Sequence, residues 1–168
     1  MSITHDKVIE LVCYDASTGL FTWNKPRPYC TAGKRAGGRT SSGYIRVILC
    51  GRPFQAHRLA WFYVHGSWPE HEIDHVNGVR DDNRLANLRE ATPSQNQANK
   101  AMRRDNTSGV KGVSWDRSRG KWHASITVSG RIKNLGRFEE IETAAAAYAE
   151  AARQFHGEFA RPERITHV

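Results

Sequence analysis

The spacing of hydrophobic and polar residues predicts short strands over most of the chain and helices at three places. In the N-terminal third, residues 19–23 and 43–49 are strand-like, and glycine-containing turns adjoin both segments. Residues 55–65 instead carry large apolar side chains at a spacing that is typical of a helix. We therefore expect a β-rich region over residues 1–55 that leads into one helix.

A polar segment follows this helix and has a different pattern. Residues 72–74 form a short run with one apolar face, and residues 88–92 alternate as a half-buried strand does. Asn77-Gly78 between them is typical of a turn, because both residues tolerate positive φ. Pro93 suits the first turn of a helix, which we expect to reach about residue 103. The segment should form a strand, a loop, a second strand and a helix.

Three polar side chains of this segment can meet at one point in such a fold. Asp74 and His75 are adjacent, and Asn96 lies in the expected helix. A carboxylate oxygen and an amide oxygen are hard ligands of the kind that Mg²⁺ prefers. An imidazole with an ordinary pKa near ~6.5 can accept a proton from water at neutral pH. These residue types suit metal-assisted cleavage of a phosphodiester bond.

The same residues resemble the motif of HNH endonucleases, the ββα-metal fold, in its phage and homing-endonuclease form. The resemblance implies that Asp74 is a metal ligand and that His75 is the general base. It implies that Asn87 holds the loop that orients the base and that Asn96 is the second metal ligand. Many members carry histidine at that last position, so the asparagine here weakens the case for Zn²⁺ and favours Mg²⁺ or Mn²⁺.

Two other interpretations of this stretch are a polar surface loop and a nuclease fold that has lost its activity. The spacing, the Asn-Gly turn and the Asn87-Leu88-Arg89 element argue against the first, and the filled catalytic positions argue against the second. Phage proteins of this type often carry a similar His-Arg-Leu upstream. His57 and Arg58 could therefore lie near the phosphate or serve a structural role.

The residue pattern in the last third of the chain predicts a second folded unit. Residues 104–109 break all periodicity and suggest a linker. Three strands are expected at 110–115, 121–128 and 131–138, followed by an alanine-rich helix at 142–155. Apolar and polar residues alternate in the middle strand, so one face of the sheet should be apolar and the other polar and exposed.

This second unit resembles the AP2 DNA-binding domain over about 50 residues. The matching motifs are Gly109-Val110-Lys111-Gly112-Val113, Gly120-Lys121-Trp122, Ala124-Ser125-Ile126, Leu135-Gly136-Arg137-Phe138, Ala146-Ala147-Tyr148 and Gly157. The resemblance implies a three-stranded antiparallel sheet, packed on one helix, that lies in the major groove of double-stranded DNA. The implied contact residues are Lys111, Ser114, Trp115, Arg117, Lys121, Ser125, Thr127, Arg131 and Lys133. Several arginines of plant AP2 domains are replaced here by Ser114, Ser125 and Thr127, so the plant target sequence cannot be carried over.

The net charge of +8 is unevenly distributed. Residues 16–69 hold eight basic residues and no acidic one, and residues 97–137 hold ten basic and two acidic residues. Residues 69–92, which include the candidate metal site, hold six acidic and three basic residues. Basic surfaces bind phosphate backbones by releasing counterions. The basic loop 34–39 could contact a phosphate or remain solvated.

Other features limit where the protein works. Its apolar runs are too short to span a bilayer, and we see no signal peptide at the N-terminus. Three widely spaced cysteines, Cys13, Cys30 and Cys50, suggest neither a disulfide framework nor a zinc knuckle. We expect a cytoplasmic location, as for a phage protein in its host cell. No protein partner is indicated, and the oligomeric state and the mobility of the gene are left open.

Together the patterns and resemblances predict an α+β protein. Residues 1–103 would form the nuclease domain with its metal-site core at 56–103, residues 104–109 the linker, and residues 110–161 the AP2 domain. The expected function is metal-dependent cleavage of DNA, and a single metal site per chain suits nicking. The alternatives are a non-catalytic DNA-binding regulator on a degenerate HNH scaffold and an RNA-directed nuclease.

Overall fold

The computed structural model describes residues 3–26, 28, 31–102 and 105–161. Contacts between residues divide the chain into two compact units, Met1–Ala91 and Thr92–Val168. Each unit has its own hydrophobic core, and both mix helices with small antiparallel sheets. The predicted α+β class is therefore correct. None of the helices in the described part of the chain is long and apolar enough to cross a membrane.

The first unit opens with a helix that the sequence patterns did not predict. Helix α1 (His5–Leu11) begins at Thr4, whose hydroxyl accepts a hydrogen bond from the backbone N–H of Lys7. It has only seven residues and buries only Val8, so it carries no helical period that could be recognised. Strand β1 (Val12–Asp15) follows and pairs antiparallel with β2 (Leu20–Trp23), which was predicted.

A three-stranded sheet and one helix form the main core of the first unit. The sheet has the order β3 (Gly38–Arg39), β4 (Ile45–Leu49) and β5 (Arg52–Gln55), and helix α2 (Ala56–His65) follows directly. The inward side chains of β4 pack in the same core as the buried side chains of α2. Both elements were predicted. Helix α2 ends at Gly66, which takes the left-handed conformation that favours glycine.

The polar segment forms a hairpin at the end of the first unit. Strand β6 (Glu72–His75) pairs antiparallel with β7 (Leu88–Ala91), and a single 3-10 turn, Leu85–Asn87, precedes β7. Ile73 and Leu88 are buried in the core of the first unit. Because side chains alternate along a strand, this anchoring fixes the direction in which the neighbouring polar side chains point.

The second unit begins with helix α3 (Pro93–Asn99), which is shorter than predicted. Thr92 caps its N-terminus, and Gln95 completes a capping box. The expectation that it would reach residue 103 was wrong, because the backbone of Lys100 is already extended, with φ −60° and ψ 140°. Residue 103 itself lies outside the described residues.

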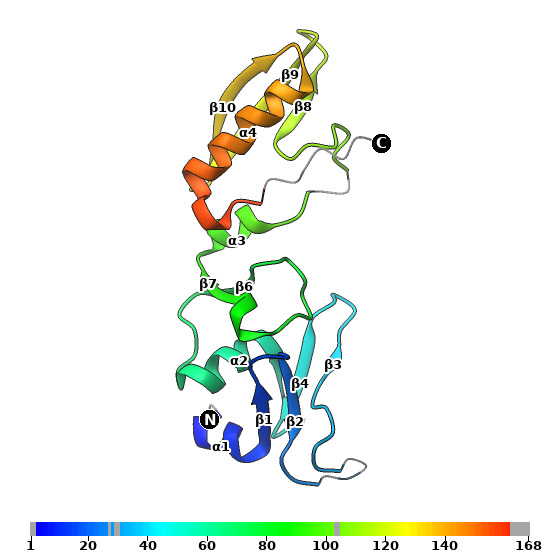
Figure 1. Ribbon diagram of the computed structural model, residues 1–168, viewed down its shortest axis with the longest axis vertical. Helices are drawn as coiled ribbons and strands as arrows, with labels where there is room; N and C mark the ends of the chain where they lie inside the picture. The colour runs from blue at the N-terminus through cyan, green and yellow to red at the C-terminus, as the bar shows by residue number, and fades with distance from the viewer. Residues whose placement is uncertain (1–2, 27, 29–30, 103–104, 162–168) are drawn as a thin grey trace. The chain divides into compact units, whose positions relative to one another are not determined.

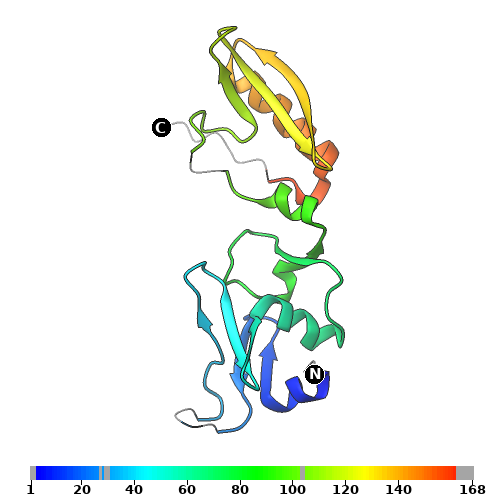
Figure 2. The same ribbon diagram turned by 180° about the vertical axis from the view of Figure 1, so that it is seen from behind.

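Three strands and a long helix make up the rest of the second unit, as predicted, although the first strand begins at Val113 and not at residue 110. Strands β8 (Val113–Asp116), β9 (Lys121–Val128) and β10 (Arg131–Phe138) form an antiparallel sheet with β9 in the centre. Helix α4 (Ile141–His156) covers one face of this sheet and leads into a 3-10 turn, η2 (Gly157–Phe159). Within this unit, Figure 1 shows α4 in front of the strands, and Figure 2 shows the other face of the sheet without a helix over it.

The described part of the predicted linker forms a turn with internal hydrogen bonds. Asn106 Oδ1 accepts hydrogen bonds from the backbone N–H of Ser108 and of Gly109, and its Nδ2 donates to the carbonyl of Val110. Next to it, Gly112 lies so close to the helix that a Cβ at this position would be 2.1 Å from Cε2 of Tyr148. Backbone and helix could not approach each other in this way with any other residue. The domain boundaries drawn from the sequence remain a prediction.

Candidate active site

Asp74 lies on β6 and is almost fully buried. Its partner across the hairpin is Arg89 on β7, in the directly paired position. The Nε and Nη2 atoms of Arg89 are both 3.0 Å from Oδ2 of Asp74. The exposed fractions of the two side chains are 15% and 6%. This ion pair fixes the orientation of the Asp74 carboxylate. Carboxylate oxygens are ligands that hard divalent cations prefer.

His75 follows Asp74 and is also buried, and its ring is surrounded by polar and aromatic groups. Its Nε2 lies 3.3 Å from Oδ1 of Asn83. The rings of His57 and Tyr44 pack against it at centroid distances of 5.0 Å and 6.0 Å. Burial lowers the pKa of His75, while the hydrogen bond to Asn83 and the charge of Asp74 partly oppose this shift. The imidazole is therefore held in its neutral form near pH 7, in which it can accept a proton.

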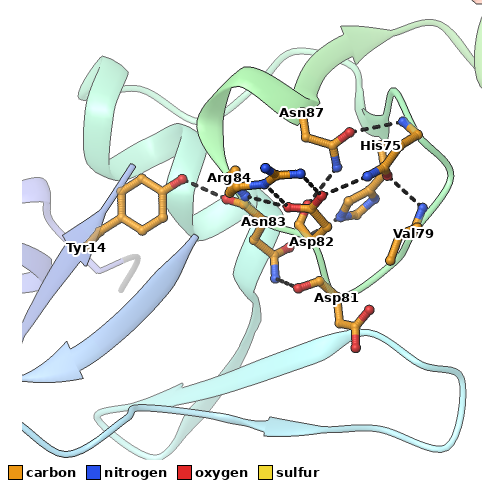
Figure 3. Close-up of polar contacts among 9 residues, drawn as sticks. Tyr14, His75, Val79, Asp81, Asp82, Asn83, Arg84 and Asn87 are labelled. Atoms are coloured by element: carbon orange, nitrogen blue, oxygen red, sulfur yellow. Dashed lines mark hydrogen bonds and ion pairs between the residues drawn. The ribbon is translucent and has the colours of Figure 1, made fainter. Parts of the chain in front are cut away.

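Asn87 joins the two ends of the loop that follows His75. Its Oδ1 accepts a hydrogen bond from the backbone N–H of Asn77 at 3.0 Å, and its Nδ2 donates to the carbonyl of Asp82 at 2.7 Å (Figure 3). The carbonyl of Asn87 accepts from the backbone N–H of Val76 at 2.9 Å. These bonds match the loop-holding role that the resemblance implies for this residue.

Of the two carboxylates in this loop, Asp81 and Asp82, Asp82 holds the loop together. Nε and Nη2 of Arg84 donate to its two oxygens at 2.8 Å and 2.6 Å, and Asn77 Nδ2 donates to Oδ2 at 2.7 Å. The bonds from Arg84 hold the pKa of Asp82 well below its usual range. Figure 3 shows this network beside His75. Asp82 thus stabilises the loop as a permanent anion.

His57 and Arg58, whose roles the sequence left open, have different surroundings. Arg58 donates from Nη1 to the carbonyl of His71 at 3.0 Å and from Nη2 to that of Pro69 at 3.4 Å, which is a structural role. His57 is buried beside His75, and its Nδ1 has no hydrogen-bond partner among the described residues. Burial lowers the pKa of His57 to about 3, and the nearby His75 and Arg58 act in the same direction. His57 is therefore neutral near pH 7 and packs against the ring of His75.

The remaining predicted metal ligand, Asn96, belongs to the second unit. It lies on α3, where its backbone N–H donates to the carbonyl of Thr92 at 2.9 Å. The structure thus brings Asp74, His75 and Asn87 together within the first unit. No group of three or more His, Cys, Asp or Glu residues that could hold a metal occurs in the described part of the chain.

The last two residues of the basic loop predicted at 34–39 form strand β3. Its last residue, Arg39, forms an ion pair with Asp81 of the loop after His75, with Nε 3.5 Å from Oδ2. Arg39 and Arg46 also line an open groove of about 420 Å³, together with the hydroxyl-bearing Thr40 and Ser41. Two guanidinium groups beside hydroxyl groups can bind phosphate oxygens.

In the second unit, the register of the sheet separates the predicted DNA contacts into groups. Ala124 and Ile126 face α4, so the alternate residues of β9 face away from it, with their paired residues on β8 and β10. Four predicted contacts lie on this outer face: Ser114, Lys121, Ser125 and Thr127. Trp115, Arg131 and Lys133 lie on the α4 side, where Lys133 Nζ is 4.2 Å from the ring centroid of Phe155. Arg117 is exposed in the turn after β8, and Lys111 donates to the carbonyls of Ala98 and Lys100.

Other residues of the outer face were not among the predicted DNA contacts. These are His123, Ile132, Asn134 and Arg137. Ile132 is 76% exposed although it is apolar, and His123 Nε2 lies 3.1 Å from Asn134 Oδ1. The available signal was the two-residue turn Ser129-Gly130, in which both residues have positive φ. Such a turn fixes the register of the adjoining part of a hairpin, so Ile132 and Asn134 could have been deduced. Arg137 could not, because the register shifts between Asn134 and Gly136.

The first unit thus presents a buried Asp-His pair at the end of a strand, with a polar loop closed by an asparagine and a helix after the second strand. Residues 54–98 match the family model of HNH endonucleases. The chain is 36% identical to protein 3.8 of Escherichia phage T7 over 106 aligned residues. The aligned region covers 62% of this chain and 87% of the phage protein. The chain belongs to the HNH endonuclease family.

A second relative is a protein of Acanthamoeba polyphaga mimivirus that is named as an uncharacterized HNH endonuclease. The identity is 32% over 126 residues, which is 74% of this chain and 64% of the mimivirus protein. No solved structure matches the chain. The family match ends at residue 98 and so leaves the sheet of the second unit without a family assignment.

Proposed function

We propose that the protein hydrolyses a phosphodiester bond of DNA with the help of a divalent metal ion. The observation that carries this proposal is the pair of buried neighbours on β6, Asp74 with its oriented carboxylate and His75 with its neutral ring. Each chain holds one such pair, so the expected product is a nick in one strand. Membership of the HNH endonuclease family supports the same reaction class.

In this proposal the residues of the site have distinct roles. Asp74 and Asn96 would hold Mg²⁺ (or Mn²⁺), which when bound stabilises the charge on the scissile phosphate and on the leaving oxygen. His75 accepts the proton of the attacking water, and Asn87 keeps the loop in the shape that orients His75. The groove beside Arg39 and Arg46 would hold a neighbouring phosphate of the same strand.

The second unit would hold the duplex, as the resemblance to AP2 domains suggests. Its sheet leaves one polar face without a helix, and the major groove is wide enough for β-strands. Arg117 and Arg137 are exposed at this sheet and can contact phosphates, while Ser125 and Thr127 can reach base edges. Holding the duplex with this unit raises the local concentration of DNA at the active site.

The ion pair between Asp74 and Arg89 favours one alternative function. A guanidinium that already neutralises the carboxylate would also suit a DNA-binding regulator that cuts nothing. Such a regulator should bind DNA equally well with Mg²⁺ and with EDTA. The proposed nuclease should cut only with the metal.

Cleavage of supercoiled plasmid separates the two functions. We expect nicked circles with Mg²⁺, none with EDTA, and a rate ~10²–10⁴-fold lower for His75→Ala, because the general base is lost. His65→Ala removes an exposed histidine from the same unit and serves as the control. If neither a plasmid nor DNA of the source genome is nicked while binding persists, the regulator is the correct function.

A further inference from the structure

We propose that Asn83 is a positioning residue that decides which nitrogen of His75 accepts the proton. In this arrangement Nε2 carries the ring hydrogen and Nδ1 is the proton acceptor. The inference rests on the proposed role of His75 as general base. It concerns a residue for which neither the motif resemblance nor the family match suggests a role.

The direction of the Asn83 side chain follows from its two neighbours. One end of the amide lies 3.2 Å from the carbonyl of Asp81, and a carbonyl can only accept a hydrogen bond. This end must therefore be Nδ2, which leaves Oδ1 facing Nε2 of His75 at 3.3 Å. Because Oδ1 also only accepts, Nε2 must carry the hydrogen, and in a neutral imidazole the lone pair is then on Nδ1.

Asn83 is itself held rigidly, which it must be if it is to select one form of the ring. It is 2% exposed, and its carbonyl accepts a hydrogen bond from the hydroxyl of Tyr14 on β1 at 2.7 Å (Figure 3). Burial raises the pKa of Tyr14 to about 12, so the hydroxyl remains a donor at any pH at which the enzyme would be assayed. The side chain and the backbone of Asn83 are thus both fixed.

The turn between β1 and β2 holds the same segment from a second side. A Cβ on Gly19 would lie 2.4 Å from both the carbonyl carbon of Asn83 and the backbone nitrogen of Arg84, so only glycine allows this approach. The carbonyl of Ala16 accepts a hydrogen bond from the backbone N–H of Leu85 at 3.0 Å. The β1–β2 hairpin, which precedes the family-matched residues 54–98, therefore supports the geometry of the base.

Asn83 and Asn87 act on different parts of the same loop. The side chain of Asn87 bonds to backbone groups of Asn77 and Asp82 and sets the path of the chain. The hydrogen bond to the imidazole ring comes from the side chain of Asn83. Loss of Asn87 should therefore disturb the loop, whereas loss of Asn83 should change the ring itself.

The test is a long-range ¹H–¹⁵N NMR spectrum of the full-length protein without metal or DNA. At about pH 8 a histidine with an ordinary pKa is neutral, and the ¹⁵N shift of each ring nitrogen shows whether it carries hydrogen. The signals of His75 are those that disappear in His75→Ala. Hydrogen on Nε2 supports the proposal, and hydrogen on Nδ1 in the wild-type protein overturns it.

Variants then test whether Asn83 is the cause. In Asn83→Ala we expect both hydrogen positions to be populated and the nicking rate to fall by ~10–100-fold with unchanged DNA affinity. Asn134→Ala removes the partner of His123 on the second unit and should leave the signals of His75 unchanged. An unaltered single form of His75 in Asn83→Ala would overturn the proposal.

Two further results keep the proposal separate from the proposed function. If Asn83→Ala does not fold, Tyr14→Phe replaces it, because this variant keeps the aromatic ring and removes only the hydroxyl that holds Asn83. We then expect the second hydrogen position of His75 to be populated, but less than in Asn83→Ala. An unchanged His75 spectrum counts against the proposal. The NMR result does not depend on cleavage. A correct hydrogen position in a protein that never nicks DNA would therefore reject the nuclease and leave the role of Asn83 intact.

Discussion

Arg89 and Asp74 face each other across the β6–β7 hairpin, and two guanidinium nitrogens donate to a single carboxylate oxygen, Oδ2. Both side chains are mostly buried. A buried carboxylate without a partner is strongly unfavourable, so this pair must be kept or replaced by another positive charge. A divalent metal ion is such a charge.

Arg89→Met should therefore make the stability of the protein depend on metal. Without metal we expect a loss of about 3 kcal/mol in the free energy of unfolding, because the buried carboxylate is left uncompensated. Added Mg²⁺ should restore more stability to this variant than it gives to the wild type. Thermal unfolding with MgCl₂ and with EDTA measures both effects.

Lys7→Met is the matched control, since it breaks an exposed ion pair with Glu10 in the same unit. It should leave the stability almost unchanged and show no metal effect, because exposed ion pairs contribute little. If Mg²⁺ stabilises Arg89→Met no more than the wild type, Asp74 is not a metal ligand.

The buried His57 should make the first unit sensitive to acid. The pKa of His57 is about 3 in the folded protein and about 6.5 when unfolded, so between these values only the unfolded chain binds the proton. The free energy of unfolding should therefore fall as the pH drops below 6.5, by about 2 kcal/mol at pH 5, and be unaffected by His57 above 6.5.

His57→Leu removes this group, so its stability should fall less between pH 7 and pH 5 than that of the wild type. Urea unfolding at both pH values, followed by NMR signals of the first unit, measures the difference. Equal pH dependence of the two proteins would show that His57 is not buried in neutral form.

Helix α3 should depend on Lys111. The ammonium group donates to the carbonyls of Ala98 and Lys100, at 2.7 Å and 2.6 Å, and so satisfies acceptors at the C-terminal end of the helix. In Lys111→Met we expect a loss of about 1–3 kcal/mol and faster hydrogen exchange of the amides of α3. Lys100→Met, which removes only an exposed bond to Gln97, should leave the exchange unchanged. Unchanged exchange in Lys111→Met would contradict the capping role.

The outer face of the second sheet should bind DNA and its opposite side should not. Thr127→Glu places a negative charge in the centre of this face, and we expect a loss of affinity of at least ~10-fold with a smaller effect at high salt. Thr143→Glu makes the same change on the exposed side of α4 and should bind as the wild type does. Fluorescence anisotropy with a labelled duplex measures both. Equal affinities would remove the sheet from the proposed function.

Much of the fold was predictable because the pattern of each element agreed with its packing. The strands at 121–128 and 131–138 have their predicted bounds, since alternation, turn residues and register all indicate the same ends. Helix α1 was missed because a seven-residue helix with one buried side chain has no period. The end of α3 was misplaced because the local pattern does not show that a side chain outside the helix, Lys111, bonds to carbonyls at this end.

Part of the candidate site could be proposed from the sequence, by residue type for Asp74 and His75 and by the family resemblance for Asn87. Asp74, His75 and Asn87 could be selected from the sequence, and the structure places them around one loop. Asn83 could not be selected, because in the sequence it is one of several polar residues in a polar loop. Only the positions of Tyr14 and Gly19, more than 60 residues earlier in the chain, distinguish it.

The position of α3 limits how this protein could be recombined with others. The family-matched segment ends within this helix, at residue 98, but the helix belongs to the second compact unit and is capped by Lys111. A hybrid joined in the predicted linker at 104–109 would keep the helix and discard its cap. Exchange of the C-terminal unit between members of this family should therefore succeed only when the foreign unit brings an equivalent lysine or when the junction lies before Thr92.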